Sequence, residues 1–221
     1  MKLSQNLAIS RYQWAEVCLK KLLHQVNSPV VSDIGAGNGQ MKSITESSGG
    51  VWQGFDLIPQ KPEIHHWNLD FPMPSHFQSP GIIIMLDVLE HLNNPWLGVQ
   101  NLANTLLPDG YLILTMPNPK WSRSRFYNLA SGYLACFTQS DLDLNHHVFT
   151  PWPHIIERLL EDIGFTIEDY VTLDGKTTLP RSPYNFRYPL RFAFSLMNIM
   201  LEKYDPTACG MSYGILAKKS R

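Results

Sequence analysis

The chain has 221 residues, of which 44% are hydrophobic and 17% charged, so it can bury the core of one α/β domain and is not expected to be disordered. A formal net charge of −1 argues against a protein that coats nucleic acid. Three widely spaced cysteines, Cys18, Cys136 and Cys209, indicate reduced thiols rather than a disulfide framework or a zinc knuckle.

Apolar segments of the chain are short. Its first residues lack the apolar region of a signal peptide. The longest apolar stretches, 81–86 and 192–201, fall well below the ~20 residues that cross a bilayer. We therefore expect a cytoplasmic protein without a transmembrane segment.

Strand and helix patterns alternate along the chain. A leading helix is expected within 9–26, because apolar residues recur there at helical spacing and Pro29 follows. The expected strands are 30–34, 51–56, 63–69, 82–87, 111–116, 165–173 and 212–218, and the expected helices are 40–47, 94–107 and one opened by Thr150-Pro151 through Leu160. This order predicts a single α/β domain with a Rossmann-like, doubly wound, mostly parallel seven-stranded sheet and helices on both faces.

Two long stretches interrupt the alternation. We divide the chain into a leading helix (1–28), a cofactor-binding half (29–118) and acceptor-side insertions at 119–149 and 174–211. The first insertion holds Lys120, Arg123 and Arg125 among aromatic residues, which could stack a base, but the net charge disfavours nucleic acid.

The second insertion combines arginines with a nearly all-apolar helix. Residues 192–201 carry no charge, so we expect them to pack in the core or to form a cap over an acceptor pocket rather than to lie on a membrane. A cap of this kind favours an apolar or lipid-linked acceptor, and Arg181, Arg187 and Arg191 could bind a phosphate or carboxylate on it.

A glycine-rich turn follows the first buried strand, in VVSDIGAGNGQ (30–40). The glycines form G-x-G-x-G, whereas a dinucleotide fingerprint needs G-x-G-x-x-G and a phosphate loop needs Gly-Lys-Ser/Thr. Asp56 ends the second strand and suits ribose hydroxyls, and Asp70 ends the third and suits an adenine amine. These features predict S-adenosylmethionine as the ligand, with its amino-acid end on the glycine backbone; a nicotinamide enzyme is the alternative.

These motifs resemble those of the class I S-adenosylmethionine-dependent methyltransferases. The likeness covers DIGAGNG (33–39), FD (55–56), NLD (68–70), DVLEHL (87–92) and LPDGYLILTMPN (107–118), and more loosely 146–170. It implies that the glycine loop holds the methionine part of the cofactor, that the second-strand acid binds the ribose and that the third-strand acid binds the adenine. The loop after the fourth strand would lie beside the cofactor, and S-adenosylhomocysteine would be the product. The implied residues are Asp33, Gly35, Ala36, Gly37, Gly39, Asp56, Leu57, Leu69, Asp70, Leu86, Asp87 and Val88.

Methyl transfer from a sulfonium is an in-line displacement, so the protein mainly aligns two reactants, which can contribute ~7–11 kcal/mol. A general base is needed only when the acceptor proton has a high pKa. The candidate bases are His91, His146 and His147. The expected reaction is methylation of a small-molecule acceptor, which could be lipid- or sugar-linked.

A metal-assisted O-methyltransferase is the runner-up. If a helix starts near Asp87, then Asp87, Glu90 and His91 share one face and could bind a divalent metal, with a downstream histidine as a fourth ligand. Small-RNA 2′-O-methyltransferases and some quinone-biosynthesis methyltransferases look similar here, but they carry glutamate where this chain has Asp87. We favour the interpretation without a metal, in which Glu90 and His91 fix the loop. A non-catalytic binding protein on the same fold is a further alternative.

Overall fold

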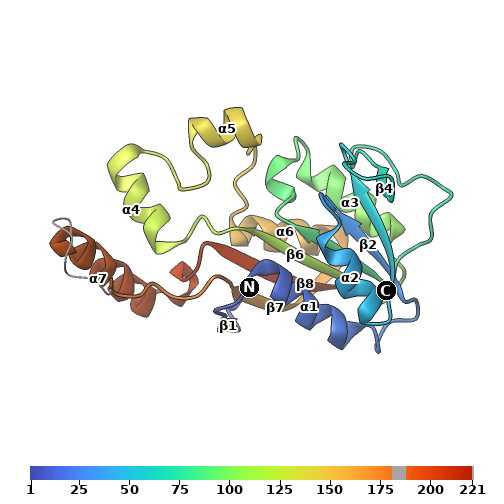
Figure 1. The fold of residues 1–221 in the computed structure, drawn as a ribbon, viewed down its shortest axis with the longest axis horizontal. Helices are drawn as coiled ribbons and strands as arrows, with labels where there is room; N and C mark the ends of the chain where they lie inside the picture. The colour runs from blue at the N-terminus through green and yellow to red at the C-terminus, as the bar shows by residue number, and fades with distance from the viewer. Residues whose placement is uncertain (181–187, 221) are drawn as a thin grey trace.

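A single eight-stranded sheet forms the centre of the computed structural model, which describes residues 1–180 and 188–220 (Figure 1). Its strand order is β1-β7-β8-β6-β5-β2-β3-β4, and only β8 runs antiparallel to its neighbours. The strands are β1 Gln5–Asn6, β2 Val30–Ile34, β3 Val51–Asp56, β4 Ile64–His66, β5 Ile82–Leu86, β6 Tyr111–Pro117, β7 Phe165–Thr172 and β8 Ser212–Lys219. The order reverses between β2 and β5, where ligands bind in open α/β sheets.

Helices cover both faces of this sheet. The helices are α1 Arg11–Leu22, α2 Gln40–Ser47, α3 Pro95–Thr105, α4 Ser122–Ser131, α5 Gln139–Asn145, α6 Pro153–Ile163 and α7 Tyr188–Tyr204, with short 3-10 turns η1 Leu89–His91 and η2 Pro206–Ala208. The α1 helix packs with Ile82 and Ile84 in one apolar cluster, and α3 and α6 pack with Ile83 and Met85 in another. Alternate residues of β5 thus enter different cores, which explains its continuous apolar run.

Most of the expected elements are confirmed within a residue or two. Asn94 caps α3 through its side chain, which accepts a hydrogen bond from the Leu97 N–H. The α6 helix, in contrast, starts at Pro153 rather than Pro151, and Trp152 occupies its N-cap without a side-chain hydrogen bond. Strand β4 ends at His66, three residues before the expected end.

The sheet has one strand more than the expected seven. The extra strand, β1, is two residues long and pairs with Val171 and Thr172 of β7. A pair of residues carries no periodic pattern, so this pairing could not be predicted from sequence. Along β7 the register shifts between Ile167 and Asp169, which marks a bulge.

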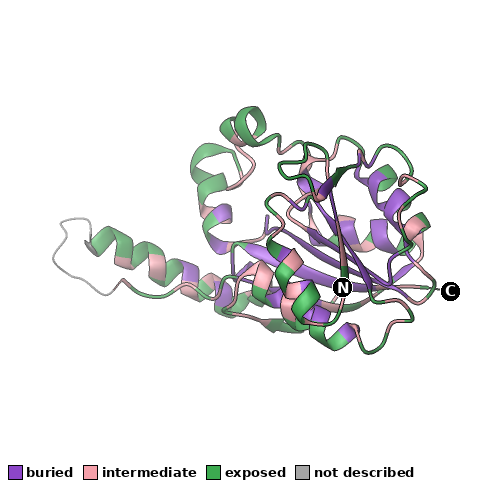
Figure 2. Ribbon diagram, turned by 45° about the vertical axis from the view of Figure 1, so that its right-hand side comes forward, coloured by how far each residue is buried: buried purple, intermediate pink, exposed green. Residues whose placement is uncertain are grey.

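The two insertions contain α4, α5 and α7, which lie beyond the carboxyl ends of the parallel strands (Figure 1). Figure 2 shows α7 projecting from the buried centre of the fold with a largely exposed surface. The expectation that 192–201 packs in the core is therefore wrong, because Phe194, Leu196, Met197 and Met200 are exposed. Arg181 and Arg187 lie outside the described residues. No described helix is long and apolar enough to cross a membrane.

Candidate functional site

Two cavities adjoin at Gly35, beyond the carboxyl ends of β2, β3 and β5. The larger cavity, of about 290 Å³, is mostly apolar and is lined by Ile34, Gly35, Phe55, Asp56, Leu57, Trp67, Asn68, Leu69, Asp87, Val88, His91 and Leu92. The smaller cavity, of about 200 Å³, is lined by Tyr12, Asp33, Gly35, Ala36, Gly37, Asn38, Gln40, Met41 and Leu86. An elongated ligand with an apolar ring system and a polar tail fits such a pair.

The glycine loop between the cavities needs glycine for two reasons. Gly35, Gly37 and Gly39 have φ values of +67°, +52° and +70°, which side chains rarely adopt. A Cβ on Gly35 would also lie 2.4 Å from Cγ2 of Val88. The loop therefore presents bare backbone to a ligand, and Val88 completes the wall beside it.

Two carboxylates are positioned by the strand ends. The Asp56 side chain accepts hydrogen bonds from the Gly37 N–H at 2.9 Å and the Ile58 N–H at 3.0 Å, which ties the loop to β3. Asp33 is buried and accepts a hydrogen bond from Trp52 Nε1 at 3.1 Å. Burial raises the pKa of Asp33 to about 6, an effect that the Trp52 bond opposes. In the described part of the chain no basic side chain forms an ion pair with Asp33.

The Asp87 carboxylate is already bound on both oxygens. Arg11 Nη1 lies 2.6 Å from Oδ2, and the Thr115 hydroxyl donates to Oδ1 at 2.7 Å. Burial raises the Asp87 pKa, and the Arg11 charge opposes this. Asp87 has a φ of +53° and precedes the 3-10 turn η1, so the expected helix that would place Asp87, Glu90 and His91 on one face does not form.

A different cluster brings Glu90, His91 and His147 together. Their ligating atoms lie within 4.8 Å of one another, and the two imidazole rings are 4.8 Å apart between centroids. His91 Nδ1 donates to the Asn145 carbonyl at 2.7 Å, and His147 Nδ1 donates to the Cys136 carbonyl at 2.5 Å. Because a carbonyl only accepts, a ring that donates from Nδ1 carries its lone pair on Nε2 in the neutral tautomer.

Glu90 is the buried member of this cluster, with 1% of its surface exposed. Its Oε2 has no hydrogen-bond partner among the described residues. Burial raises the Glu90 pKa to about 8, and the nearby Asp87 charge adds to this. Burial also lowers the pKa of His91, opposed by its bond to Asn145, which favours the neutral imidazole.

The structure gathers ten of the twelve residues that were expected to bind the cofactor. Asp33, Gly35, Ala36, Gly37, Asp56, Leu57, Leu69, Leu86, Asp87 and Val88 line the two cavities. Gly39 instead forms the N-cap of α2. Asp70 is exposed and lines neither cavity. Strand β4 ends before it, at His66, and the side chain of Asn68 accepts a hydrogen bond from the Asp70 N–H. Asn68 and Leu69 line the larger cavity instead. Of the candidate bases, His146 is exposed at the end of α5 and lies outside the Glu90-His91-His147 cluster.

Several residues of the site were missed by sequence reasoning. Arg11 and Tyr12 come from α1, where their spacing indicates only a packed helix face. Trp67 and Asn68 lie three and two residues before Asp70, the acid that was predicted to bind adenine. Thr115 lies on buried β6, and no local signal relates it to Asp87.

Comparisons with known proteins identify the family and the fold of the chain. The family model described as "Methyltransferase domain" matches residues 9–170. A search of curated protein sequences finds no match. Among solved structures, an S-adenosylmethionine-dependent methyltransferase from Archaeoglobus fulgidus is 17% identical, with a TM-score of 0.59 and 95% of each chain covered.

Two further structures share the fold. A putative sarcosine dimethylglycine methyltransferase from Galdieria sulphuraria is 14% identical, with a TM-score of 0.59 over 94% of this chain and 86% of that one. The plantazolicin methyltransferase BamL, in complex with a triazolic desmethylPZN analog and SAH, is 13% identical, with a TM-score of 0.58 over 96% of this chain and 85% of that one. The family match spans more than half of the residues, and the chain therefore belongs to the methyltransferase-domain family, with the fold of the class I S-adenosylmethionine-dependent enzymes.

Proposed function

We propose that the chain transfers a methyl group from S-adenosylmethionine to a small-molecule acceptor. The observation that carries this proposal is the pair of cavities joined at Gly35. The larger one offers aromatic and aliphatic side chains for adenine and the Asp56 carboxylate for ribose hydroxyls. The smaller one offers loop backbone and Asp33 for an amino-acid tail.

The charges of the site fit this cofactor. Asp33 is a buried carboxylate without an ion-pair partner among the described residues, so a bound ammonium group would supply the missing positive charge. Bare backbone at Gly35 and Gly37 allows close approach of a ligand that lacks phosphate. The negative charge of a pyrophosphate would be repelled by the carboxylates of Asp33 and Asp56.

The residues of the chain would mainly align the reactants. S-adenosylmethionine would supply a methyl group on its sulfonium sulfur. The acceptor's nucleophile would bond to the methyl carbon as the carbon–sulfur bond breaks, and the electron pair of the broken bond would stay on sulfur. His91 lines the larger cavity with Nε2 unprotonated, so it can take the proton that the acceptor releases. Apolar walls exclude water from the same space.

Asp56→Ala should remove most of the stabilisation that S-adenosylmethionine or S-adenosylhomocysteine gives to the wild-type protein. At about 100 times its dissociation constant, a ligand adds ~2.7 kcal/mol to the free energy of unfolding. The measurement is a thermal melt with each ligand and with NAD. Asp70→Ala is the matched control, because Asp70 lines neither cavity, and it should keep the gain.

Other outcomes of this melt would contradict the proposal. Stabilisation by NAD instead would identify a nicotinamide enzyme. No response to any of the three ligands would favour a non-catalytic protein on the same fold. An equal loss in Asp56→Ala and Asp70→Ala would show that the ribose assignment is wrong.

A metal-assisted O-methyltransferase, of the quinone or RNA 2′-O type, is the second candidate, and the Glu90-His91-His147 cluster favours it. Two imidazoles and a carboxylate suit a divalent ion such as Zn²⁺ or Co²⁺, and three protein ligands leave a position for substrate. The unpartnered Glu90 Oε2 and the Nδ1 bonds of both imidazoles fit this use. An ion bound there would polarise a hydroxyl oxygen of the acceptor.

His147→Ala and Glu90→Gln should weaken Co²⁺ binding by more than about 100-fold, since even an outer hydrogen-bond partner contributes 10- to 100-fold. Binding is measured from the visible absorption of the Co²⁺ complex, in the absence of acceptor. His146→Ala is the control, because His146 neighbours His147 but lies outside the cluster. Equal Co²⁺ affinity in all variants, or turnover unchanged by a chelator, would eliminate the metal.

A further inference from the structure

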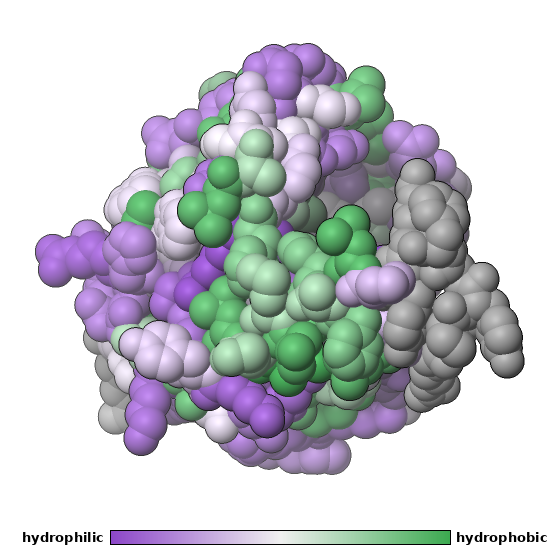
Figure 3. Space-filling view, turned by 90° about the vertical axis from the view of Figure 1, so that its left-hand side faces the viewer, coloured by the Kyte–Doolittle hydropathy of each residue, from purple (hydrophilic) through white to green (hydrophobic). Residues whose placement is uncertain are grey.

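The exposed side of α7 is apolar, which is the reverse of an ordinary surface helix. Figure 3 shows hydrophobic side chains gathered in one patch on this end of the molecule. At 100° per residue, the exposed apolar residues of α7 fall within one arc of about 160°. They are Leu190, Ala193, Phe194, Leu196, Met197, Met200 and Tyr204. We call this set the α7 apolar face.

Polar side chains occupy the buried side of the same helix. Glu202 is buried and accepts hydrogen bonds from the Ser122 hydroxyl of α4 and from the backbone and hydroxyl of Thr177. Asn198 is fully buried. These contacts fix the rotation of α7 about its axis, so the apolar face points outward because the polar face is bound. A helix oriented in this way needs an apolar environment outside the molecule.

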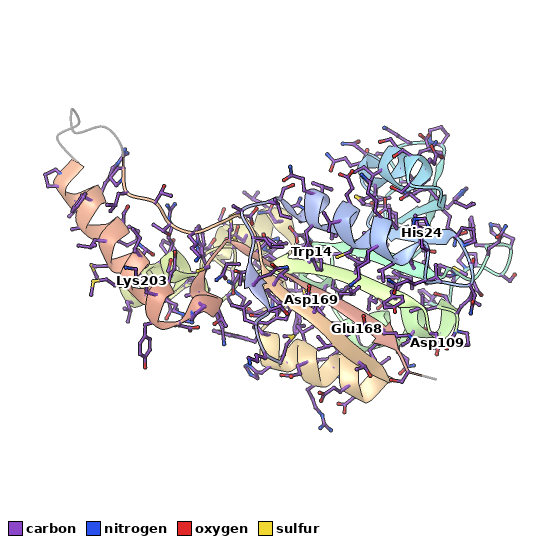
Figure 4. All side chains as sticks on the ribbon, turned by 90° about the horizontal axis from the view of Figure 1, so that it is seen from below. Trp14, His24, Asp109, Glu168, Asp169 and Lys203 are labelled. Carbon is purple, nitrogen blue, oxygen red and sulfur yellow. The ribbon has the colours of Figure 1, made fainter. Side chains whose placement is uncertain are left out.

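Basic residues border the α7 apolar face. By the same angular spacing, Lys203 lies about 20° beyond one end of the arc (Figure 4 labels Lys203). Arg191 lies about 60° beyond the other end, and its side chain lines a shallow hollow together with Leu190, Ala193, Phe194 and Met197 of the face. Arg123 of α4 is exposed and lines a cavity of about 510 Å³ together with Arg191. The only acid within the described α4 and α7 helices is Glu202, whose carboxylate is hydrogen-bonded inside. The positive charge is therefore local, in a chain whose net charge is −1.

We propose that the α7 apolar face lies on an anionic lipid membrane, with Arg191, Lys203 and Arg123 at the level of the headgroups. Exposed Leu, Phe and Met side chains bordered by cations are the pattern of a helix that rests in the interface plane. A bilayer supplies both the apolar layer and the negative charge. A two-fold contact between copies of this chain would instead bring the same cations together.

This placement does not depend on the methyl-transfer proposal. It differs from the sequence interpretation, in which 192–201 packs in the core or forms a cap over the acceptor pocket. The cations lie just outside that run, at 191 and 203, and the polar residues that orient the helix are bound to the protein. No described helix could span the membrane, so the contact is peripheral.

The test is sedimentation with vesicles of equal parts phosphatidylglycerol and phosphatidylcholine, against vesicles of phosphatidylcholine alone. Wild-type protein should bind the anionic vesicles and release them at high salt. Arg191→Gln with Lys203→Gln should weaken binding roughly 30-fold, since each cation near an anionic surface contributes about five-fold. Leu190→Ser with Met200→Ser should weaken it at least about 10-fold.

Matched controls carry the same changes on other surfaces. Lys20→Gln with Arg158→Gln removes two exposed cations, and Val17→Ser with Ile58→Ser removes two exposed apolar side chains. Both controls should bind as wild type does, and a thermal melt verifies that all variants are folded. Absence of vesicle binding, equal binding to neutral vesicles, or equal loss in variants and controls would overturn the proposal. So would a concentration-dependent dimer that Leu190→Ser with Met200→Ser dissolves, which would assign the face to a second copy.

Discussion

Gly35→Ala should abolish detectable binding of S-adenosylmethionine, as measured by isothermal titration calorimetry. The alanine would have to hold a φ near +67°, at a strain of about 1–3 kcal/mol. Its Cβ would also meet Cγ2 of Val88 at 2.4 Å. Val88 is β-branched and stiff, so relief requires the loop or the wall of the larger cavity to move. Both movements deform the place where the two cavities join.

Two companion variants separate strain from steric overlap. Gly164→Ala introduces alanine at a φ of +94° with no atom within 4 Å of its Cβ, far from the cavities, and should leave binding unchanged. Adding Val88→Ala to Gly35→Ala removes the overlap and should restore part of the affinity. Unchanged binding in Gly35→Ala alone would show that the cofactor lies elsewhere.

Asp33→Asn should stabilise the cofactor-free protein at pH 8 and weaken its cofactor binding. The Asp33 pKa rises from 3.8 in the unfolded chain to about 6 in the fold. The fold therefore holds a proton that the unfolded chain has lost, and wild-type stability should fall as pH rises through this window. A shift of about two units corresponds to ~3 kcal/mol, or roughly 6 to 12 °C in a domain of this size.

The measurement is the melting temperature between about pH 4.5 and pH 8, without ligand. The difference in melting temperature between variant and wild type should increase as pH rises towards 6, because Asp33 ionises and the amide of the variant cannot. It should stay constant above about pH 7. Asp162→Asn, on the exposed face of α6, is the control and should change little. If the variant is no more stable than wild type at pH 8, then ionisation of Asp33 in the folded protein does not lower the free energy of unfolding.

The features that sequence predicted best are those with a local physical cause. The run at Ile82–Leu86 is buried on both faces, and the glycines at 35, 37 and 39 all have positive φ. Each requirement acts on the residue itself or on its neighbours in the chain. The fold class and half of the residues lining the two cavities followed from such signals.

The rest depended on contacts between distant segments. Arg11 meets Asp87 across 76 positions, and His147 meets His91 only because the chain after α5 returns to η1. The rotation of α7 is set by Glu202 and its partners on α4 and at Thr177, which a count of apolar residues within the helix cannot reveal.

The edges of the sheet bear on how the protein behaves at high concentration. The β4 edge is only three residues long, and at the opposite edge β7 is partly covered by β1. The remainder of β7 has a bulge and carries Glu168 and Asp169 (Figure 4). Short, kinked and charged edges resist strand-to-strand pairing between molecules. We therefore expect the sheet to resist growth into fibrils by edge pairing.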